Sequence, residues 1–227
     1  PICLEPGVVG NAIRLVGGED PNAAYVDTGA NARDLGIWAG RARSISVWVN
    51  NAGVAGRSGV YRIGQYNSAN QVDALINQNH VGHGWQFDHW GFNYGFTLVP
   101  SLNAWNHFVK AYDGANIRIY ANGELLTTYG ASLDTASGGG AQDLAVGYFG
   151  DFDASYQHGV FRGLIDEVKL FNYALSPAEA GALWLEGPAE GPLCMIESEY
   201  DLNDDCRVDL EDFAIFAPEW LQDTLIA

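Results

Sequence analysis

The stretch that decides the fold runs from Trp105 to Thr128 and reads WNHFVKAYDGANIRIYANGELLTT. Within it, His107–Tyr112 and Ile117–Ala121 have the alternation of apolar and polar residues that is typical of half-buried strands. The dipeptide Asn122-Gly123 predicts a tight hairpin turn of the primed type, which leads into a third strand over Glu124–Thr128. This stretch therefore predicts antiparallel β-structure.

Strands are also predicted on both sides of this stretch. Ser44–Asn50 alternates in the same way, and further strands are expected over Ala12–Val16, Tyr61–Tyr66, Gly95–Pro100, Asp143–Gly147 and Val160–Phe171. Only Pro177–Leu185 has helical character, with Ser176 as the N-cap and Glu179 at the capping-box position. Many antiparallel strands with one peripheral helix predict an all-β, two-sheet antiparallel sandwich.

The predicted strand Val160–Phe171 changes its alternation midway. Phe161 and Ile165 share one parity, whereas Val168 and Leu170 have the opposite one. A β-bulge at Asp166-Glu167 reconciles the two halves. Two interpretations remain open: a carboxylate aimed at a metal ion, or a solvent-facing acid pair at a kink in the strand.

Five motifs occur in an order that resembles a known family. They are GNAIRL (10–15), SISVWV (44–49), WNHFVKAYDG (105–114), IYANG (119–123) and GLIDEVKLFNYALS (163–176). Together they resemble a laminin-G-like (concanavalin A-like lectin/glucanase) jelly roll of the bacterial extracellular type, over about residues 8–185. The resemblance implies that Trp48 and Trp105 belong to the core, and that Asp20 and Asp166 hold a structural calcium ion. It does not fix a function, because such folds host lectins, carbohydrate-binding modules, adhesins and hydrolases.

The charge of the chain is strongly negative and unevenly distributed. Acids outnumber bases 28 to 11 among 227 residues, for a net charge of -17. This argues against a nucleic-acid partner. With no long apolar stretch and only two lysines, the chain is also not expected to span or coat a membrane. Residues 188–227 contain eleven acids and one base, hence -10 of the total. We expect a sandwich domain over residues 1–186, a Gly/Pro linker over 187–193 and an acidic module over 194–227.

The acidic module contains the spacing of an EF-hand-like calcium loop. Oxygen ligands stand at loop positions 1, 3, 5, 9 and 12, with a backbone carbonyl at position 7; they are Asp201, Asn203, Asp205, Asp209, Asp212 and, through its carbonyl, Arg207. The pattern is similar to one half of a dockerin and predicts Ca²⁺ as cofactor. Cys206 stands at position 6, where glycine is usual, and the sequence contains a single repeat. A cohesin-type partner is therefore doubtful.

The segment Asn79–Asn93 concentrates histidine and tryptophan. One interpretation is a glycan site in which Trp85 or Trp90 stacks on sugar rings while Asp88 and Asn93 orient hydroxyl groups. A second is a transition-metal site formed by His80, His83, Asp88 and His89. The third is a loop or strand pair whose aromatic rings pack against the sandwich.

Three cysteines allow one disulfide with one thiol left over. Cys194–Cys206 would brace the calcium loop, and Cys3–Cys194 is the rival pairing. With a calcium loop and a secreted-type sandwich, an oxidising extracellular or cell-surface setting is expected.

These features favour a non-catalytic, calcium-braced carbohydrate-binding or adhesion module. The chain contains neither the Glu-x-Asp-x-x-Glu strand of retaining glycosidases on this fold nor a Gly-x-Ser-x-Gly nucleophile motif. Two alternatives stay open: a structural or surface-layer subunit that self-associates as a homo-oligomer, and a polysaccharide lyase or hydrolase.

Overall fold

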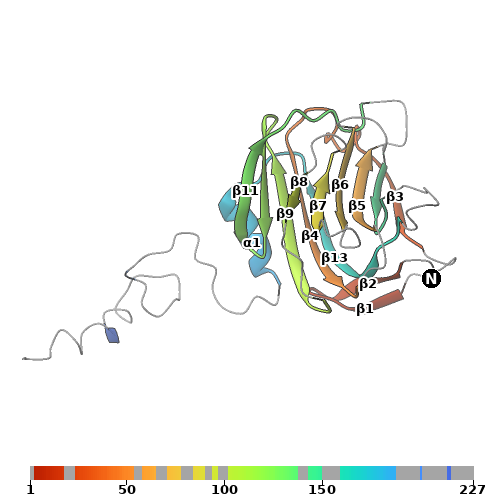
Figure 1. Ribbon diagram of the computed structural model, residues 1–227, viewed down its shortest axis with the longest axis vertical. Coiled ribbons are helices and arrows are strands. Elements are labelled where there is room, and N and C mark those ends of the chain that lie inside the picture. Colours follow the sequence, from red (N-terminus) through yellow and green to blue (C-terminus); the bar gives the residue numbers. More distant parts are fainter. Residues whose placement is uncertain are drawn as a thin grey trace, which may run out of the picture.

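The structure is a computed structural model that describes residues 3–17, 24–53, 58–64, 71–77, 84–89, 94–96, 102–137, 143–149, 159–187, 200 and 214–215. These residues form two antiparallel sheets that face each other, with one short helix on the outside (Figure 1). The predicted two-sheet sandwich is therefore confirmed. Among the residues described, no helix is long and apolar enough to cross a bilayer.

The first sheet has seven strands. In order across the sheet they are β1 (Cys3–Pro6), β2 (Asn11–Val16), β13 (Arg162–Phe171), β4 (Arg43–Asn51), β9 (Trp105–Tyr112), β10 (Asn116–Ala121) and β11 (Glu124–Gly130). The chain thus returns at its last strand, β13, to lie between β2 and β4 near its beginning.

The second sheet has six strands. In order they are β3 (Val26–Asn31), β12 (Asp143–Val146), β5 (Ser58–Gly64), β6 (Val72–Asn77), β7 (Trp85–Asp88) and β8 (Tyr94–Phe96).

The hydrophobic core lies between the two sheets. Val47 of β4, Phe108 of β9 and Ile119 of β10 contribute to it from the first sheet, and Leu75 of β6 and Phe87 of β7 contribute from the second. Each of these side chains is at most 1% exposed. Burying a side chain of this size stabilises the fold by about 1.5–3 kcal/mol, so the two inner faces hold the sheets together.

Two local predictions are confirmed in detail. Asn122 and Gly123, between β10 and β11, have φ values of 50° and 85°, which is the conformation of a primed hairpin turn. The helix α1 spans Pro177–Leu185, and Ser176 and Glu179 form the reciprocal capping box. Through Ala180, α1 packs on the outer face of the seven-stranded sheet (Figure 1).

Three strands were not expected, β1, β3 and β6, and a strand at β7 was only one of the interpretations offered for its segment. All six residues of β6 are buried, so its two faces do not differ in the way that an alternating pattern requires. Strand β7 has four residues and lies inside the segment Asn79–Asn93, where its length is too short to establish a period.

Candidate functional site

The largest group of ionisable side chains lies between the sheets. Asp73 of β6 accepts a hydrogen bond from Arg43 Nε of β4 at 2.9 Å and pairs through its other oxygen with Lys110 of β9. Tyr61 donates to the same carboxylate at 3.2 Å, and Arg43 also donates to Thr135 at 2.5 Å. This ion cluster therefore joins both sheets and satisfies each charge within the core.

The pKa values in the ion cluster follow from its burial. Burial alone would raise the pKa of Asp73, but the charges of Lys110 and Arg43 outweigh that effect and hold it well below its usual value. Burial lowers the pKa of Lys110 to about 8, against the opposing effect of Asp73. Because Arg43, Asp73 and Lys110 are at most 1% exposed, no ligand reaches them, and the cluster is structural.

A serine–histidine pair lies on the outer face of the seven-stranded sheet. Ser46 Oγ and His107 Nε2 are 2.8 Å apart, but both residues are 1% exposed. Burial lowers the pKa of His107 to about 3, and its Nδ1 has no hydrogen-bond partner among the described residues. An activated nucleophile requires access and a group that orients the base. The pair provides neither.

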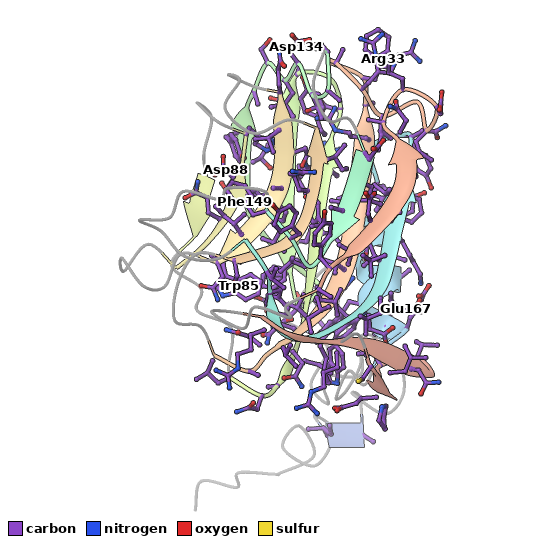
Figure 2. The ribbon with its side chains drawn as sticks, turned by 90° about the vertical axis from the view of Figure 1, so that its right-hand side faces the viewer. Arg33, Trp85, Asp88, Asp134, Phe149 and Glu167 are labelled. Atoms are coloured by element: carbon purple, nitrogen blue, oxygen red, sulfur yellow. The ribbon has the colours of Figure 1, made fainter. Side chains whose placement is uncertain are left out.

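The structure contradicts the glycan-binding prediction for Trp85 and Asp88. Trp85 is 0% exposed and stacks on Phe108, with ring centroids 5.4 Å apart. It shares the inward parity of Phe87, and a ring without exposed surface cannot stack on a sugar. Asp88 is also 0% exposed and lies opposite Ala74, on the outer side of the six-stranded sheet near Phe149 (Figure 2).

The packing interpretation therefore holds for the strand that the structure describes in this segment. Trp90 and Asn93 lie outside the described residues, as do His80 and His83, so the remaining parts of the glycan and transition-metal interpretations stay predictions. His89 is described and is 0% exposed; burial lowers its pKa to about 3.

The predicted bulge at Asp166-Glu167 is confirmed. The pairing of β13 with β4 shifts register between Asp166 and Lys169, and Glu167 has a φ of 47°. The bulge turns the Asp166 carboxylate toward the β1–β2 turn, where Oδ2 accepts hydrogen bonds from the amides of Val8 at 2.7 Å and Val9 at 3.1 Å.

Neither interpretation of the acid pair describes this arrangement fully. Asp166 is 7% exposed, and its carboxylate holds the amides of Val8 and Val9, an arrangement we call the amide clamp. Glu167 forms an ion pair with Lys169 at 2.9 Å. It lies on the opposite side of the molecule from Asp88 (Figure 2). Within the described part of the chain, no three His, Cys, Asp or Glu side chains are grouped to hold a metal ion. Asp20 lies outside that part, so calcium at Asp20 and Asp166 stays a prediction.

The predicted calcium loop and disulfide fall in the C-terminal module. Asp201, Asn203, Asp205, Arg207, Asp209, Asp212, Cys194 and Cys206 all lie outside the described residues. Cys3 is exposed and forms no disulfide within the described structure. These predictions therefore stand as made.

A polar hollow opens on the outer face of the seven-stranded sheet, near the ends of β2 and β4. Its volume is about 370 Å³, within the range of roughly 300–1,000 Å³ that is usual for small-molecule sites. Its polar lining consists of Glu5, Arg14, Asn50, Asn103 and Arg162. We refer to these five residues and the space they enclose as the hollow.

Strand register builds the hollow. Leu164 of β13 lies directly opposite Arg14 of β2 on one side and Asn50 of β4 on the other, so the three side chains share one face of the sheet. Gly163 has a φ of 139°, and a Cβ there would lie 2.1 Å from the carbonyl oxygen of Asn50. Only glycine fits where β13 and β4 approach so closely.

The two arginines of the hollow differ in their partners. Arg14 forms an ion pair with Glu5 across the β1–β2 ladder, and the two side chains are 53% and 36% exposed. The guanidinium of Arg162 forms no hydrogen bond or ion pair with any described residue. All N–H donors of the Arg162 guanidinium are therefore available to a ligand.

Trp105 lies at the border of the hollow. It does not itself line the hollow, but it is directly opposite the lining residue Asn50 in the β4–β9 register and is half-buried, so it shares the outer face of the sheet with Asn50. The resemblance placed Trp105 in the core, and the structure corrects this. Trp48, by contrast, is 2% exposed and stacks on Trp184 of α1 at 4.8 Å.

Reasoning from the sequence did not identify the arginines and asparagines of the hollow. The local signal was present, because Arg14 stands between the inward residues Ile13 and Leu15 and must point outward. Strand order was the missing information: β2, β13 and β4 are far apart in the sequence, and only their adjacency places these side chains together.

Comparison with solved structures shows the same fold in sugar-binding proteins. The chain is similar to domain 4 of AbnA, an extracellular GH43 arabinanase from Geobacillus stearothermophilus, in complex with arabinotriose, with a TM-score of 0.57, 19% identity and coverage of 81% of each chain. It is similar to the CBM40 of the Ruminococcus gnavus IT-sialidase bound to α2,3-sialyllactose, with a TM-score of 0.56, 16% identity and coverage of 76% of this chain and 95% of that one.

It is also similar to the leech intramolecular trans-sialidase, with a TM-score of 0.56, 18% identity and coverage of 81% of this chain and 28% of that one. No curated protein matches the chain. A family model, however, matches residues 20–181, which span the sandwich from before β3 into α1. The chain therefore belongs to the concanavalin A-like lectin/glucanases superfamily.

Proposed function

We propose that this protein is a non-catalytic carbohydrate-binding protein whose ligand occupies the hollow. The observation that carries the proposal is a cavity of about 370 Å³ whose polar lining is two asparagines, two arginines and Glu5, with the half-buried Trp105 beside Asn50 in the β4–β9 register. Amide and guanidinium groups bind hydroxyl oxygens, and an aromatic face packs on the C–H face of a sugar ring. Two proteins of the same fold, the arabinanase domain and the CBM40, are in complex with oligosaccharides.

A glycan array that contains neutral and acidic oligosaccharides tests this function. We expect the wild-type chain to bind a subset of the array, and we expect Asn50→Ala and Trp105→Ala to weaken that binding. Trp38→Ala is the matched control, because Trp38 is also partly buried but lies under Arg33 at the other end of the sandwich (Figure 2). Thermal unfolding of each variant separates loss of binding from loss of fold. Absence of binding to every glycan by a folded wild-type chain would refute the function.

A second function, self-association, is favoured by one observation. β11 is an edge strand of the seven-stranded sheet, and its Leu125 and Leu126 are 52% and 38% exposed. Exposed apolar edge strands pair with other chains unless they are blocked. We expect light scattering to show a homo-oligomer that Leu125→Lys dissociates, whereas Leu102→Lys, at a 57% exposed leucine outside the strands, leaves the mass unchanged. A monomer in the wild type would exclude this function.

The C-terminal module is proposed to bind Ca²⁺ through Asp201, Asn203, Asp205, Asp209, Asp212 and the Arg207 carbonyl. The ligand spacing supports this proposal. In calorimetric titration of the full chain with Ca²⁺, we expect Asp201→Asn with Asp205→Asn to remove the binding heat. Asp27→Asn with Asp34→Asn, two exposed acids of the sandwich, is the matched control. Heat that persists in the first variant would point to another site, and its loss on Asp20→Asn would assign it to Asp20 and Asp166.

An extracellular setting and a Cys194–Cys206 disulfide are proposed together with the calcium loop. The exposed thiol of Cys3 would then be the single reactive one. We expect thiol titration of the denatured, non-reduced chain to find one free thiol. Three free thiols would exclude any disulfide, and peptide mapping that links Cys3 to Cys194 would favour the rival pairing.

A further inference from the structure

The position of the two arginines gives the hollow a positive character. Arg162 lies opposite Val16, and the next outward residue of β13, Leu164, lies opposite Arg14. Arg14 and Arg162 are therefore diagonal neighbours on adjacent strands, a relation in which residues are typically about 7–8 Å apart and long side chains meet. Glu5 neutralises one of them, so the charged side chains that line the hollow sum to about one positive charge.

The positive charge of the hollow is opposite in sign to the net charge of the chain. The net charge is -17, so the chain as a whole repels anions. A neutral sugar accepts hydrogen bonds from a guanidinium but leaves its positive charge without a counter-charge. A guanidinium does, however, offer paired N–H donors that match a carboxylate or a sulfate group.

We propose that the hollow selects anionic glycans, with Arg162 binding the carboxylate or sulfate group of the sugar. Asn50 and Asn103 bind neighbouring hydroxyl groups, and Trp105 packs against the ring. This inference rests on the proposed carbohydrate-binding function and adds the class of ligand.

Glu5 has a specific part in this site. Its carboxylate accepts a hydrogen bond from the guanidinium of Arg14. It therefore takes the place that a second anionic group of the ligand would have beside Arg14. Removing the charge of Glu5 frees Arg14 and raises the positive charge of the hollow to about two. Because the two side chains are 53% and 36% exposed, the loss of the ion pair itself has little effect on the fold. Glu5→Gln is therefore a variant that improves binding if the proposal is correct.

The test uses pairs of glycans that differ only in charge. The full chain is titrated with polyuronic and sialylated oligosaccharides, with their carboxyl-reduced counterparts, and with sulfated oligosaccharides and their desulfated counterparts. We expect the charged member of at least one pair to bind about 10-fold more tightly, with an affinity that falls as salt is added. The carboxylate and sulfate arms identify which group is bound.

Three variants locate the binding. Arg162→Gln should remove the preference for the charged member, and Glu5→Gln should increase it. Arg41→Gln, an exposed arginine beside Trp38 and outside the hollow, should leave it unchanged. Equal binding of charged and neutral members would overturn the inference while leaving the proposed function intact. Charge preference that survives Arg162→Gln would overturn the assignment to the hollow. Binding of no glycan at all would refute both the function and the inference.

Discussion

The sandwich holds its cations in two different ways. In the core, Arg43 and Lys110 share the carboxylate of Asp73, and each charge has a partner from the opposite sheet. In the hollow, Arg14 has a partner on its own sheet and Arg162 has none among the described residues. The same cationic side chain is thus a structural link where water is excluded, and it is open to a ligand where water is not excluded. The two roles differ in whether the protein itself supplies a partner for the charge of the cation.

Removing the acid of the ion cluster should have the largest effect on stability. Asp73→Asn leaves two buried cations without a counter-charge, and we expect a loss of about 3–5 kcal/mol in the free energy of unfolding. Urea denaturation measures it, with the exposed Asp27→Asn as the control. Replacing all three members by apolar residues should recover most of the loss. A loss below about 1 kcal/mol for Asp73→Asn would contradict the description of the cluster.

Acid should destabilise the core through its buried histidines. Burial lowers the pKa values of His89 and His107 to about 3, whereas unfolded histidines titrate near 6.5. Below that pH the unfolded chain therefore binds more protons, and stability falls as pH falls. From pH 6.5 to pH 5 we expect a loss of about 3 kcal/mol from the two residues together.

Unfolding measured across this pH range tests the expectation. His107→Gln, which keeps a polar group near Ser46, should reduce the pH dependence by about half. An unchanged slope in that variant would show that His107 does not titrate on unfolding. The arginines of the hollow contribute nothing to this slope, since guanidinium groups stay charged throughout.

The amide clamp of Asp166 should have a smaller effect. Oδ2 of Asp166 accepts from the amides of Val8 and Val9, and Oδ1 accepts from the amide of Glu167. Asp166→Asn replaces one of these oxygens by a donor, so in either orientation an amide loses its acceptor, and the uncharged oxygen that remains is a weaker acceptor; we expect a loss of about 1–2 kcal/mol. Hydrogen exchange of the Val8 and Val9 amides gives the local readout and should speed up. If exchange at Val8 and Val9 is unchanged, the clamp does not hold the β1–β2 turn in solution.

The smallest effect on stability is expected at Arg162. Because its guanidinium has no described partner, Arg162→Gln should change the free energy of unfolding by no more than about 0.5 kcal/mol. The same variant should have a large effect on glycan binding. A clear loss of stability would instead give Arg162 a structural role and remove the contrast with Arg43.

Features that depend on a few neighbouring residues were predictable from the sequence. Asn122-Gly123 permits the left-handed conformation of its turn, Ser176 and Glu179 cap α1, and the parity change after Ile165 marks the bulge. Each of these is local chemistry.

Features that depend on strand order were not predictable. The acid Asp73 gave no sign that it would lie inside, because the strand that carries it is buried on both faces. The hollow draws on β1, β2, β4 and β13, whose adjacency is a property of the complete sheet. Trp85 shows the opposite error. The histidines and tryptophans around it in the sequence suggested a binding surface, whereas its position opposite Asn77 in the β6–β7 ladder places it in the core.

The end of α1 has a consequence for how this protein presents a ligand. A Cβ at Gly187 would lie 2.1 Å from the indole of Trp48, so the chain leaves the sandwich in contact with β4. Asn50 of the hollow is the next outward residue along the same strand. With the predicted linker over residues 187–193, a ligand of the C-terminal module and a ligand of the hollow would be joined by a chain that starts beside β4, and a short linker gives an effective concentration in the millimolar range, about 1 mM or more. Two weak attachments to one target would then act as a single strong one.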